Sequence, residues 1–350
     1  MNQISFPGLG ILDLPVDPVA FTLPIFGGMD IMWYAVIITC GFIAAFLYAW
    51  LRAKHTEGYR IDDLLDMMIF VILFGVLGAR LYYVLMSPNE FDSFFDVLNI
   101  RSGGLAIYGG LICGVCAILG VCKVKKMNLW RVLDMVAPGV MIAQAIGRWG
   151  NFMNAEAYGA ATTLPWRMCS PSIASEMLRK GFVDIDGYNA ILDGSLGVHP
   201  TFLYESLWNV LGFVVLNLVY RKKKYNGQIL LSYLIWYGFG RMWIEGLRTD
   251  SLYLGAFRIS QLISFLAFTA GLTLFIIMWI KGRKAPVINI CSFCTEDRKR
   301  VPVSEESKQE EPKKPLDTEP SAPMEPPHES PKEPTIKEST PKGEENNGTE

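Results

Sequence analysis

The chain has 350 residues, 51% of which are hydrophobic, and its mean hydropathy is +0.27. Several apolar runs reach the ~20 residues that a helix needs to cross a bilayer, which excludes a purely water-soluble protein and indicates a polytopic membrane protein. The formal net charge of -2 gives no basic excess, and we expect no nucleic-acid partner.

Seven apolar runs are predicted to be membrane-spanning helices, which makes residues 1–285 an all-α membrane protein. They cover residues 31–51, 64–86, 102–122, 132–146, 201–220, 229–244 and 259–280. Residues 1–30 contain no Lys or Arg and lack the basic start and short apolar core of a signal peptide. Residues 151–199 are polar and are predicted to form a small domain outside the membrane.

Basic residues gather directly after the first, third, fifth and seventh runs. The positive-inside rule therefore predicts an N-terminus outside, a C-terminus in the cytoplasm and an extracytoplasmic domain at residues 151–199. Residues 286–350 are rich in Pro, Glu, Lys, Ser and Thr, and such a segment buries too little apolar surface to offset its chain entropy. We predict that it is a disordered cytoplasmic tail.

The cysteines form no recognisable metal or disulfide framework. Cys40, Cys113, Cys116 and Cys122 lie within apolar runs, where cysteine usually acts as a small buried hydrophobic side chain. Cys291 and Cys294 form a lone CxxC, which is a weak metal or redox signal without a second pair. The chain also has no glycine-rich phosphate loop and no dinucleotide fingerprint, so we predict no metal and no cofactor.

The polar run at residues 147–159 directly follows the fourth apolar run. It contains Arg148, Asn151, Asn154 and Glu156 together with three glycines, which predicts a backbone that leaves the helix and turns polar groups inward. A guanidinium at the end of a hydrocarbon-embedded helix is costly unless a partner offsets its charge. A snorkelling arginine at a helix C-terminus would explain Arg148 alone, but the whole run favours a functional site.

The sixth apolar run ends in a second polar set. Arg241 and Glu245 are four residues apart and share one helix face with Tyr237, one turn earlier. This run leads outward, so Arg241 and Arg148 are expected on the same outer side of the membrane. Two converging arginines require an anion, and a phospholipid phosphate would supply it. Alternatively, Glu156 and Glu245 partner the arginines, because intramembrane charges often pair with one another.

Three further polar residues lie close to the ends of the apolar runs. Glu205 lies one turn into the fifth run and is expected to pair with an arginine inside the bundle. Tyr108 lies between the glycine pairs at residues 103–104 and 109–110, where it faces the space that the glycines leave or is an ordinary interfacial tyrosine. His199 has no second histidine or carboxylate at ligand spacing, so we assign it no metal.

Together these motifs resemble the prolipoprotein diacylglyceryl transferase family. The run Gly147-Arg148-Trp149-Gly150-Asn151-Phe152-Met153-Asn154-Ala155-Glu156 is similar to the family signature GR-x-GNF-x-N-x-E. Further family positions occur in the same order, namely Trp33-Tyr34, Gly78-Ala79-Arg80, Asp134, Pro138, His199-Pro200, Tyr204-Glu205 and Arg248. The resemblance covers residues 20–285 and leaves the tail unmatched.

The resemblance implies a multi-pass enzyme of the bacterial plasma (inner) membrane. It would transfer diacylglyceryl from phosphatidylglycerol to the lipobox cysteine thiol of an exported prolipoprotein, forming a thioether and releasing glycerol 1-phosphate. The partners implied are therefore this membrane lipid and the lipobox of a signal peptide. Arg148 and Arg241 resemble the essential arginines of the family. The lipid-binding surroundings implied by the resemblance are Tyr34, Arg80, Asn151, Glu156, Gly159, His199, Glu245 and Arg248.

Tyr108 departs from the family pattern, because many members have a histidine at this position. We expect Tyr108 to orient or hydrogen-bond a reacting group, or else another group takes the thiol proton. Guanidinium groups can hold the lipid phosphate, stabilise its departure and favour a nearby thiolate. A seven-helix transporter or channel for an anion or lipid is the competing hypothesis. The polar groups gather on one side rather than along a path through the bundle, which argues against it.

Overall fold

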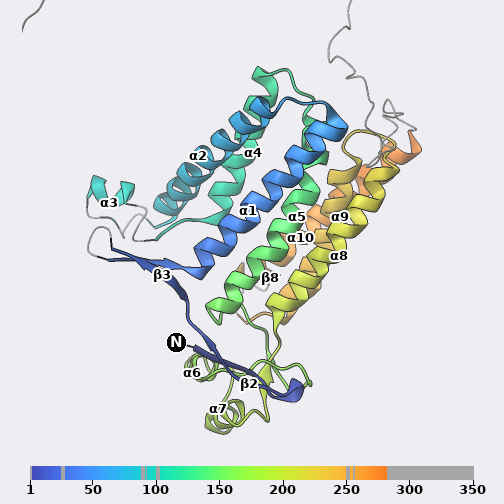
Figure 1. Cartoon of the computed structure of the whole chain (residues 1–350). Coiled ribbons are helices and arrows are strands. Elements are labelled where there is room, and N and C mark those ends of the chain that lie inside the picture. The colour runs from blue at the N-terminus through green and yellow to red at the C-terminus, as the bar shows by residue number, and fades with distance from the viewer. Residues whose placement is uncertain are drawn as a thin grey trace, which may run out of the picture. The chain divides into compact units, whose positions relative to one another are not determined.

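The computed structural model of the chain describes residues 2–24, 28–87, 91, 93–99, 103–249, 253–254 and 257–281 (Figure 1). The predicted tail at residues 286–350 and the Cys291/Cys294 pair lie outside the described residues. Six described helices are long and apolar enough to cross a membrane by length and composition. These six are α1 (Trp33–Arg52), α2 (Ile61–Met86), α4 (Ile107–Val124), α5 (Leu129–Met153), α8 (Thr201–Arg221) and α10 (Ile259–Ile280).

A seventh long helix, α9 (Gln228–Leu247), forms where the sixth apolar run is predicted. It carries Arg241 and Glu245, and it is not one of the candidate spans among the described residues. The long helices therefore confirm the prediction of a largely helical, multi-pass membrane protein, while the number of spans, seven, stays a prediction.

The long helices pack side by side in pairs (Figure 1). Helix α1 packs along α5, α5 along α8, and α9 contacts α5, α8 and α10, while α2 packs along α4. The α2–α4 contact depends on glycine, because a Cβ on Gly109 would lie 2.2 Å from the carbonyl oxygen of Gly78. Such close backbone approach is the packing that small residues permit between membrane helices, as predicted for the third apolar run.

Asp134 joins α5 to the start of α9 and is fully buried (0% exposed). Its carboxylate accepts backbone N–H bonds from Gly227 at 2.6 Å, and from Ile229 and Leu230 at 2.9 Å each. Lys223 Nζ lies 2.9 Å from the same carboxylate. Unpaired N–H groups at a helix start favour a negative partner, so Asp134 fixes the N-terminus of α9.

Glu57 lies near Asp134, at the same end of the long helices, and Lys223 contacts both carboxylates. It accepts hydrogen bonds from Arg131 Nε at 2.7 Å and from the Tyr220 hydroxyl at 2.5 Å. It is the last residue of η2 (Ala53–Glu57), a π-helical continuation of α1. We call Glu57, Arg131, Asp134, Tyr220 and Lys223 the base cluster. Four helical elements meet there through mutually paired charges, which is how buried ions are tolerated.

A small domain, the cap domain (residues 2–16 and 155–200), lies at the opposite end of the long helices (Figure 1). Its elements are β1 (Asn2–Phe6), η1 (Pro7–Leu9), β2 (Ile11–Val16), β5 (Ala161–Thr162), α6 (Pro171–Arg179), α7 (Ile185–Leu192) and β6 (Gly197–Val198). Residues 2–16 pack against the segment predicted as an extra domain at residues 151–199, and the boundaries of that domain stay a prediction. Ser5 and Cys169 exchange two backbone hydrogen bonds of 2.8 Å, which join β1 to the later part of the chain.

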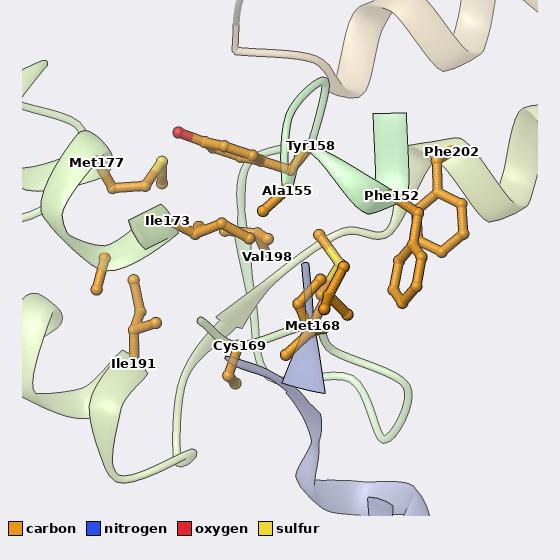
Figure 2. Packing of buried hydrophobic residues seen from close by; sticks show 13 residues of the cluster. Phe152, Ala155, Tyr158, Met168, Cys169, Ile173, Met177, Ile191, Val198 and Phe202 are labelled. Atoms are coloured by element: carbon orange, nitrogen blue, oxygen red, sulfur yellow. The ribbon is translucent and has the colours of Figure 1, made fainter. Parts of the chain in front are cut away.

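Figure 2 shows the apolar core of the cap domain. Met168, Ile173 and Val198 come from residues 155–200, and Ile4 and Val16 come from β1 and β2. Phe152 and Phe202, from the ends of α5 and α8, close the core on the side of the long helices, with their ring centroids 4.9 Å apart. This shared core attaches the cap domain to α5, whose end carries the polar run at residues 147–159, and to the start of α8.

Five short elements complete the described residues. Two are the strands β3 (Val19–Leu23) and β4 (Met29–Met32), which pair and lead into α1. The strands β7 (Tyr253–Leu254) and β8 (Phe257–Arg258) pair before α10, and α3 (Phe94–Leu98) follows α2. The all-α prediction missed these hairpins, since they are short and carry no long alternating pattern.

Helix α5 corrects one sequence-based expectation. The fourth run was predicted to end at residue 146, with the backbone leaving the helix in the polar run, but α5 continues to Met153. The glycines of the polar run do not end the helix. Gly150 has a packing role instead, since a Cβ at this position would lie 2.9 Å from the Tyr34 ring. The chain turns only afterwards, where Ala155 and Ala157 take positive φ values of 52° and 56°.

Candidate functional site

Four charged side chains from three helices form a continuous chain of ion pairs. Arg148 Nη2 on α5 lies 2.5 Å from Glu205 Oε1 on α8. The other carboxylate oxygen, Glu205 Oε2, lies 2.6 Å from Arg241 Nη1 on α9. Arg241 Nη2 in turn lies 2.7 Å from Glu245 Oε2, one turn further along α9. The structure therefore brings Arg148 and Arg241 together, as the sequence predicted, through a shared carboxylate.

Asn151 extends this cluster along the last turn of α5. Arg148 Nη1 donates to Asn151 Oδ1 at 3.3 Å, and Asn151 Nδ2 donates to Glu156 Oε1 at 2.9 Å. Asn154 Nδ2 makes a longer bond of 3.4 Å to the same oxygen. Glu156 is exposed, unlike the buried carboxylates of Glu205 and Glu245. The predicted alternative, in which glutamates partner the arginines, holds directly for Glu245 but only through Asn151 for Glu156.

The candidate lipid-binding residue Tyr34 lies beside this polar turn of α5. Its ring lies against Gly150, between Arg148 and Asn151 in sequence. Tyr34 is in the first turn of α1, so packing of α1 along α5 brings its phenol to the site. The order of residues 148–151 therefore has a geometric reason. Gly150 leaves space for the Tyr34 ring, and Arg148 and Asn151 place polar groups before and after that glycine.

Glu205 was not among the site residues predicted from the sequence. Its side chain is buried (2% exposed) and is the only element of the four-charge chain that touches both arginines. The sequence signal was a carboxylate one turn into an apolar helix, and the expected pairing with an arginine is confirmed. Sequence alone could not show that one carboxylate serves two arginines, because they come from helices far apart in the chain.

Gly159 occupies a crowded backbone position between α8 and α9. Its N–H donates to the His199 carbonyl at 2.9 Å, and the next residue, Ala160, donates to the Leu247 carbonyl at 2.8 Å. A Cβ on Gly159 would lie 2.7 Å from His199 Cβ, 2.9 Å from the Leu247 oxygen and 3.0 Å from Thr201 Cγ2. Gly159 thus allows the cap domain to approach the ends of both helices.

We expect Gly159→Ala to reduce activity strongly, by about tenfold or more, since small displacements of positioning elements cost 10–100-fold in rate. Backbone oxygen and a Cβ atom line the position, so neighbouring atoms cannot give way cheaply. Transfer activity and thermal stability of the purified variant measure the effect. Gly181→Ala is the control for adding a methyl group without a clash, because no atom lies within 4 Å of a Cβ at this position. Its φ of 73° makes alanine mildly strained there. Full activity of Gly159→Ala would contradict this assignment.

His199 is held by Tyr204 of α8, which in turn is bonded to Trp166 of the cap domain. Its Nδ1 lies 3.2 Å from the Tyr204 hydroxyl, which accepts a 2.6 Å hydrogen bond from Trp166 Nε1. Burial lowers the pKa of His199, which favours the neutral ring at neutral pH. Tyr204 directly precedes Glu205, so His199 lies near the site, while its role in lipid binding stays a prediction.

Arg80 lies among backbone carbonyl groups rather than in the four-charge chain. Its guanidinium donates to the carbonyl oxygens of Asp96, Val97, Gly103 and Gly104 at 2.6 to 3.0 Å. These bonds hold two described pieces of backbone between α2 and α4, residues 96–97 and 103–104. Lipid binding by Arg80 stays a prediction, and the contacts described for it are structural.

Tyr108 and Arg248 occupy two different edges of the site region. Tyr108 is half-buried in the first turn of α4, and among the described residues no hydrogen bond or ion pair joins it to Arg148 or Arg241. Arg248 follows α9, where its backbone N–H donates to the Glu245 carbonyl at 3.2 Å and its backbone bridges to Gly159. The catalytic role predicted for Tyr108 and the lipid contact predicted for Arg248 remain predictions.

Within the described part of the chain, no group of three or more His, Cys, Asp or Glu side chains could hold a metal ion. The cluster instead offers guanidinium groups. Such groups bind phosphate through charge-assisted, often bidentate hydrogen bonds, so the site is suited to a phosphorylated ligand.

Comparisons with known proteins agree with this chemistry. A family model described as prolipoprotein diacylglyceryl transferase matches residues 18–277. A protein of Finegoldia magna is 43% identical over 271 residues, covering 77% of this chain and 97% of the relative. A protein of Clostridioides difficile is 43% identical over 258 residues, covering 73% and 93%. A protein of Listeria welshimeri is 40% identical over 268 residues, covering 76% and 91%. All three are named phosphatidylglycerol–prolipoprotein diacylglyceryl transferase.

Proposed function

Because the chain belongs to the prolipoprotein diacylglyceryl transferase family, we propose that it transfers diacylglyceryl from phosphatidylglycerol to the lipobox cysteine of a prolipoprotein. The products are a thioether and glycerol 1-phosphate. The observation that supports this most is the convergence of Arg148 and Arg241, from α5 and α9, on one buried carboxylate. A pair of guanidinium groups at one point is suited to the phosphate of the lipid.

The reaction is an attack of sulfur on a glycerol carbon. The cysteine thiol loses its proton, the thiolate forms the C–S bond, and the C–O bond to the phosphate breaks. Arg148 and Arg241 hold the phosphate and stabilise the charge that develops on it as it leaves. Tyr34, Asn151 and Glu156 form the polar wall beside it, at the end of α5.

The site also has a place in the membrane under this proposal. We assign α9 as a seventh span, since Glu205 of α8 and Glu245 of α9 offset the charge of Arg241 inside the bundle. With the N-terminus outside, the cap domain and the cluster face the outer side of the bacterial plasma membrane, where an exported prolipoprotein arrives. Residues 286–350 then lie in the cytoplasm.

The function is tested with the purified full-length chain, phosphatidylglycerol and a peptide that contains a lipobox. We expect mass spectrometry to show the peptide with one added diacylglyceryl group in thioether linkage. A matched peptide with serine in place of the cysteine is the control and should stay unmodified. Binding of phosphatidylglycerol without any modified peptide would instead support a lipid-binding transporter.

A further inference from the structure

Glu205 is placed to set the geometry of the two site arginines. Its two carboxylate oxygens are divided between them: Oε1 lies 2.5 Å from Arg148 Nη2, and Oε2 lies 2.6 Å from Arg241 Nη1. Without a shared anion, two guanidinium groups this close would repel each other. The positions of both groups therefore depend on one side chain of α8.

The partners of Glu205 distinguish it from a buried carboxylate that serves only the fold. Asp134, at the opposite end of the long helices, accepts three backbone N–H bonds and so fixes the start of a helix. The described hydrogen bonds and ion pairs of the Glu205 side chain go only to Arg148 and Arg241.

The arginines keep donors for a ligand while Glu205 holds them. A guanidinium has five N–H donors. Within the described residues, Arg148 donates to Glu205 and Asn151, and Arg241 donates to Glu205 and forms an ion pair with Glu245. The remaining N–H groups are available to phosphate oxygens, so the lipid does not have to displace the carboxylate.

We propose that Glu205 is a positioning residue, which holds the guanidinium groups of Arg148 and Arg241 at the spacing that one lipid phosphate requires. This inference rests on the proposed transferase function. Glu205 acts through the arginines and not on the reacting atoms. Removing its charge leaves both cations in place, so attraction for phosphate persists while their alignment in the transition state is lost.

The prediction for Glu205→Gln is a split between turnover and lipid affinity. We expect kcat to fall about 100-fold, because misplaced positioning groups cost up to this factor, while KM for phosphatidylglycerol changes less than about threefold. Glu205→Asp keeps the charge on a shorter side chain and should be intermediate, with about a tenfold loss of kcat. Initial rates at varied phosphatidylglycerol, with a lipobox peptide and an active wild-type preparation, give both constants.

A double-mutant cycle separates positioning from a general effect on the fold. If Glu205 acts through Arg241, Glu205→Asp should cost less than about threefold when Arg241→Gln is already present, because coupled residues are not additive. Glu57→Gln is the matched control, since Glu57 is another buried carboxylate bonded to an arginine, in the base cluster. Its cost should be the same with and without Arg241→Gln.

Two outcomes would overturn the proposal. One is Glu205→Gln with the kcat of the wild type, and the other is a Glu205→Asp loss that multiplies fully with that of Arg241→Gln. Circular dichroism and thermal unfolding show whether each variant is folded, and rates are expressed per folded protein. If the wild type itself modifies no peptide, the transferase function fails, which is a different result from any failure among the variants.

Discussion

Arg241→Gln is expected to reduce the turnover of diacylglyceryl transfer by about 10³-fold, since removing one group that stabilises transition-state charge costs 10²–10³ in kcat. Glutamine cannot donate two parallel hydrogen bonds from a cation, and Glu205 and Glu245 lose a shared partner. The same loss is expected for Arg148→Gln, which leaves Glu205 with one arginine. Transfer of radiolabelled diacylglyceryl from phosphatidylglycerol to a lipobox peptide measures both variants.

Arg131→Gln is the matched control for these two variants. Arg131 is also a partly buried arginine bonded to a glutamate, Glu57, but it lies in the base cluster away from the site. We expect this variant to be less stable and to keep wild-type turnover per folded molecule. Full transfer by Arg148→Gln or Arg241→Gln would contradict the role assigned to the pair.

Asp134→Ala should give the largest loss of stability, about 3–5 kcal/mol in the free energy of unfolding, as when one partner of a buried ion pair is removed. The change leaves Lys223 without its nearest carboxylate and leaves three N–H groups at the start of α9 without an acceptor. Thermal unfolding in detergent measures the loss.

Asp186→Ala provides a reference for the Asp134 result. Asp186 is an exposed residue of α7, where a substitution should change stability by less than about 0.5 kcal/mol. Asp134→Asn should fall between the two, because an amide oxygen still accepts hydrogen bonds but carries no charge. An unchanged unfolding temperature for Asp134→Ala would show that α9 begins without this cap.

The apolar runs predicted the long helices well, because twenty residues of hydrocarbon-compatible sequence leave few other structures possible in a membrane. The pair of Arg241 and Glu245 was also predictable, since residues four apart share a helix face. The C-terminal end of α5 was not predictable. Glycines in a sequence usually indicate a helix end, and only the structure shows that Gly150 stays in the helix and makes room for the Tyr34 ring. The contact between α1 and α5 explains this glycine, and such a contact between helices cannot be derived from the spacing of residues in the sequence.

The contacts of Glu205 show the same limit of sequence-based prediction within the site. A glutamate in an apolar run predicts an ion pair, but its position between two arginines follows from how α5, α8 and α9 pack. Similarly, Arg80 was predicted as a lipid ligand from its place in a motif, whereas its described bonds go to the carbonyls between α2 and α4. Charge and motif indicate that a residue matters, and packing decides what it contacts.

The hydrogen bonds between Ser5 and Cys169 have a consequence for how the protein is made. They close a loop that contains α1, α2, α4 and α5, so the β1–β2 hairpin can join Cys169 only after those four helices have been made. Closing so long a loop late is slow and entropically unfavourable. Docking of the β1–β2 hairpin onto the segment around Cys169 is therefore a late step in folding of the cap domain, and a bulky fusion attached ahead of β1 would interfere with that step.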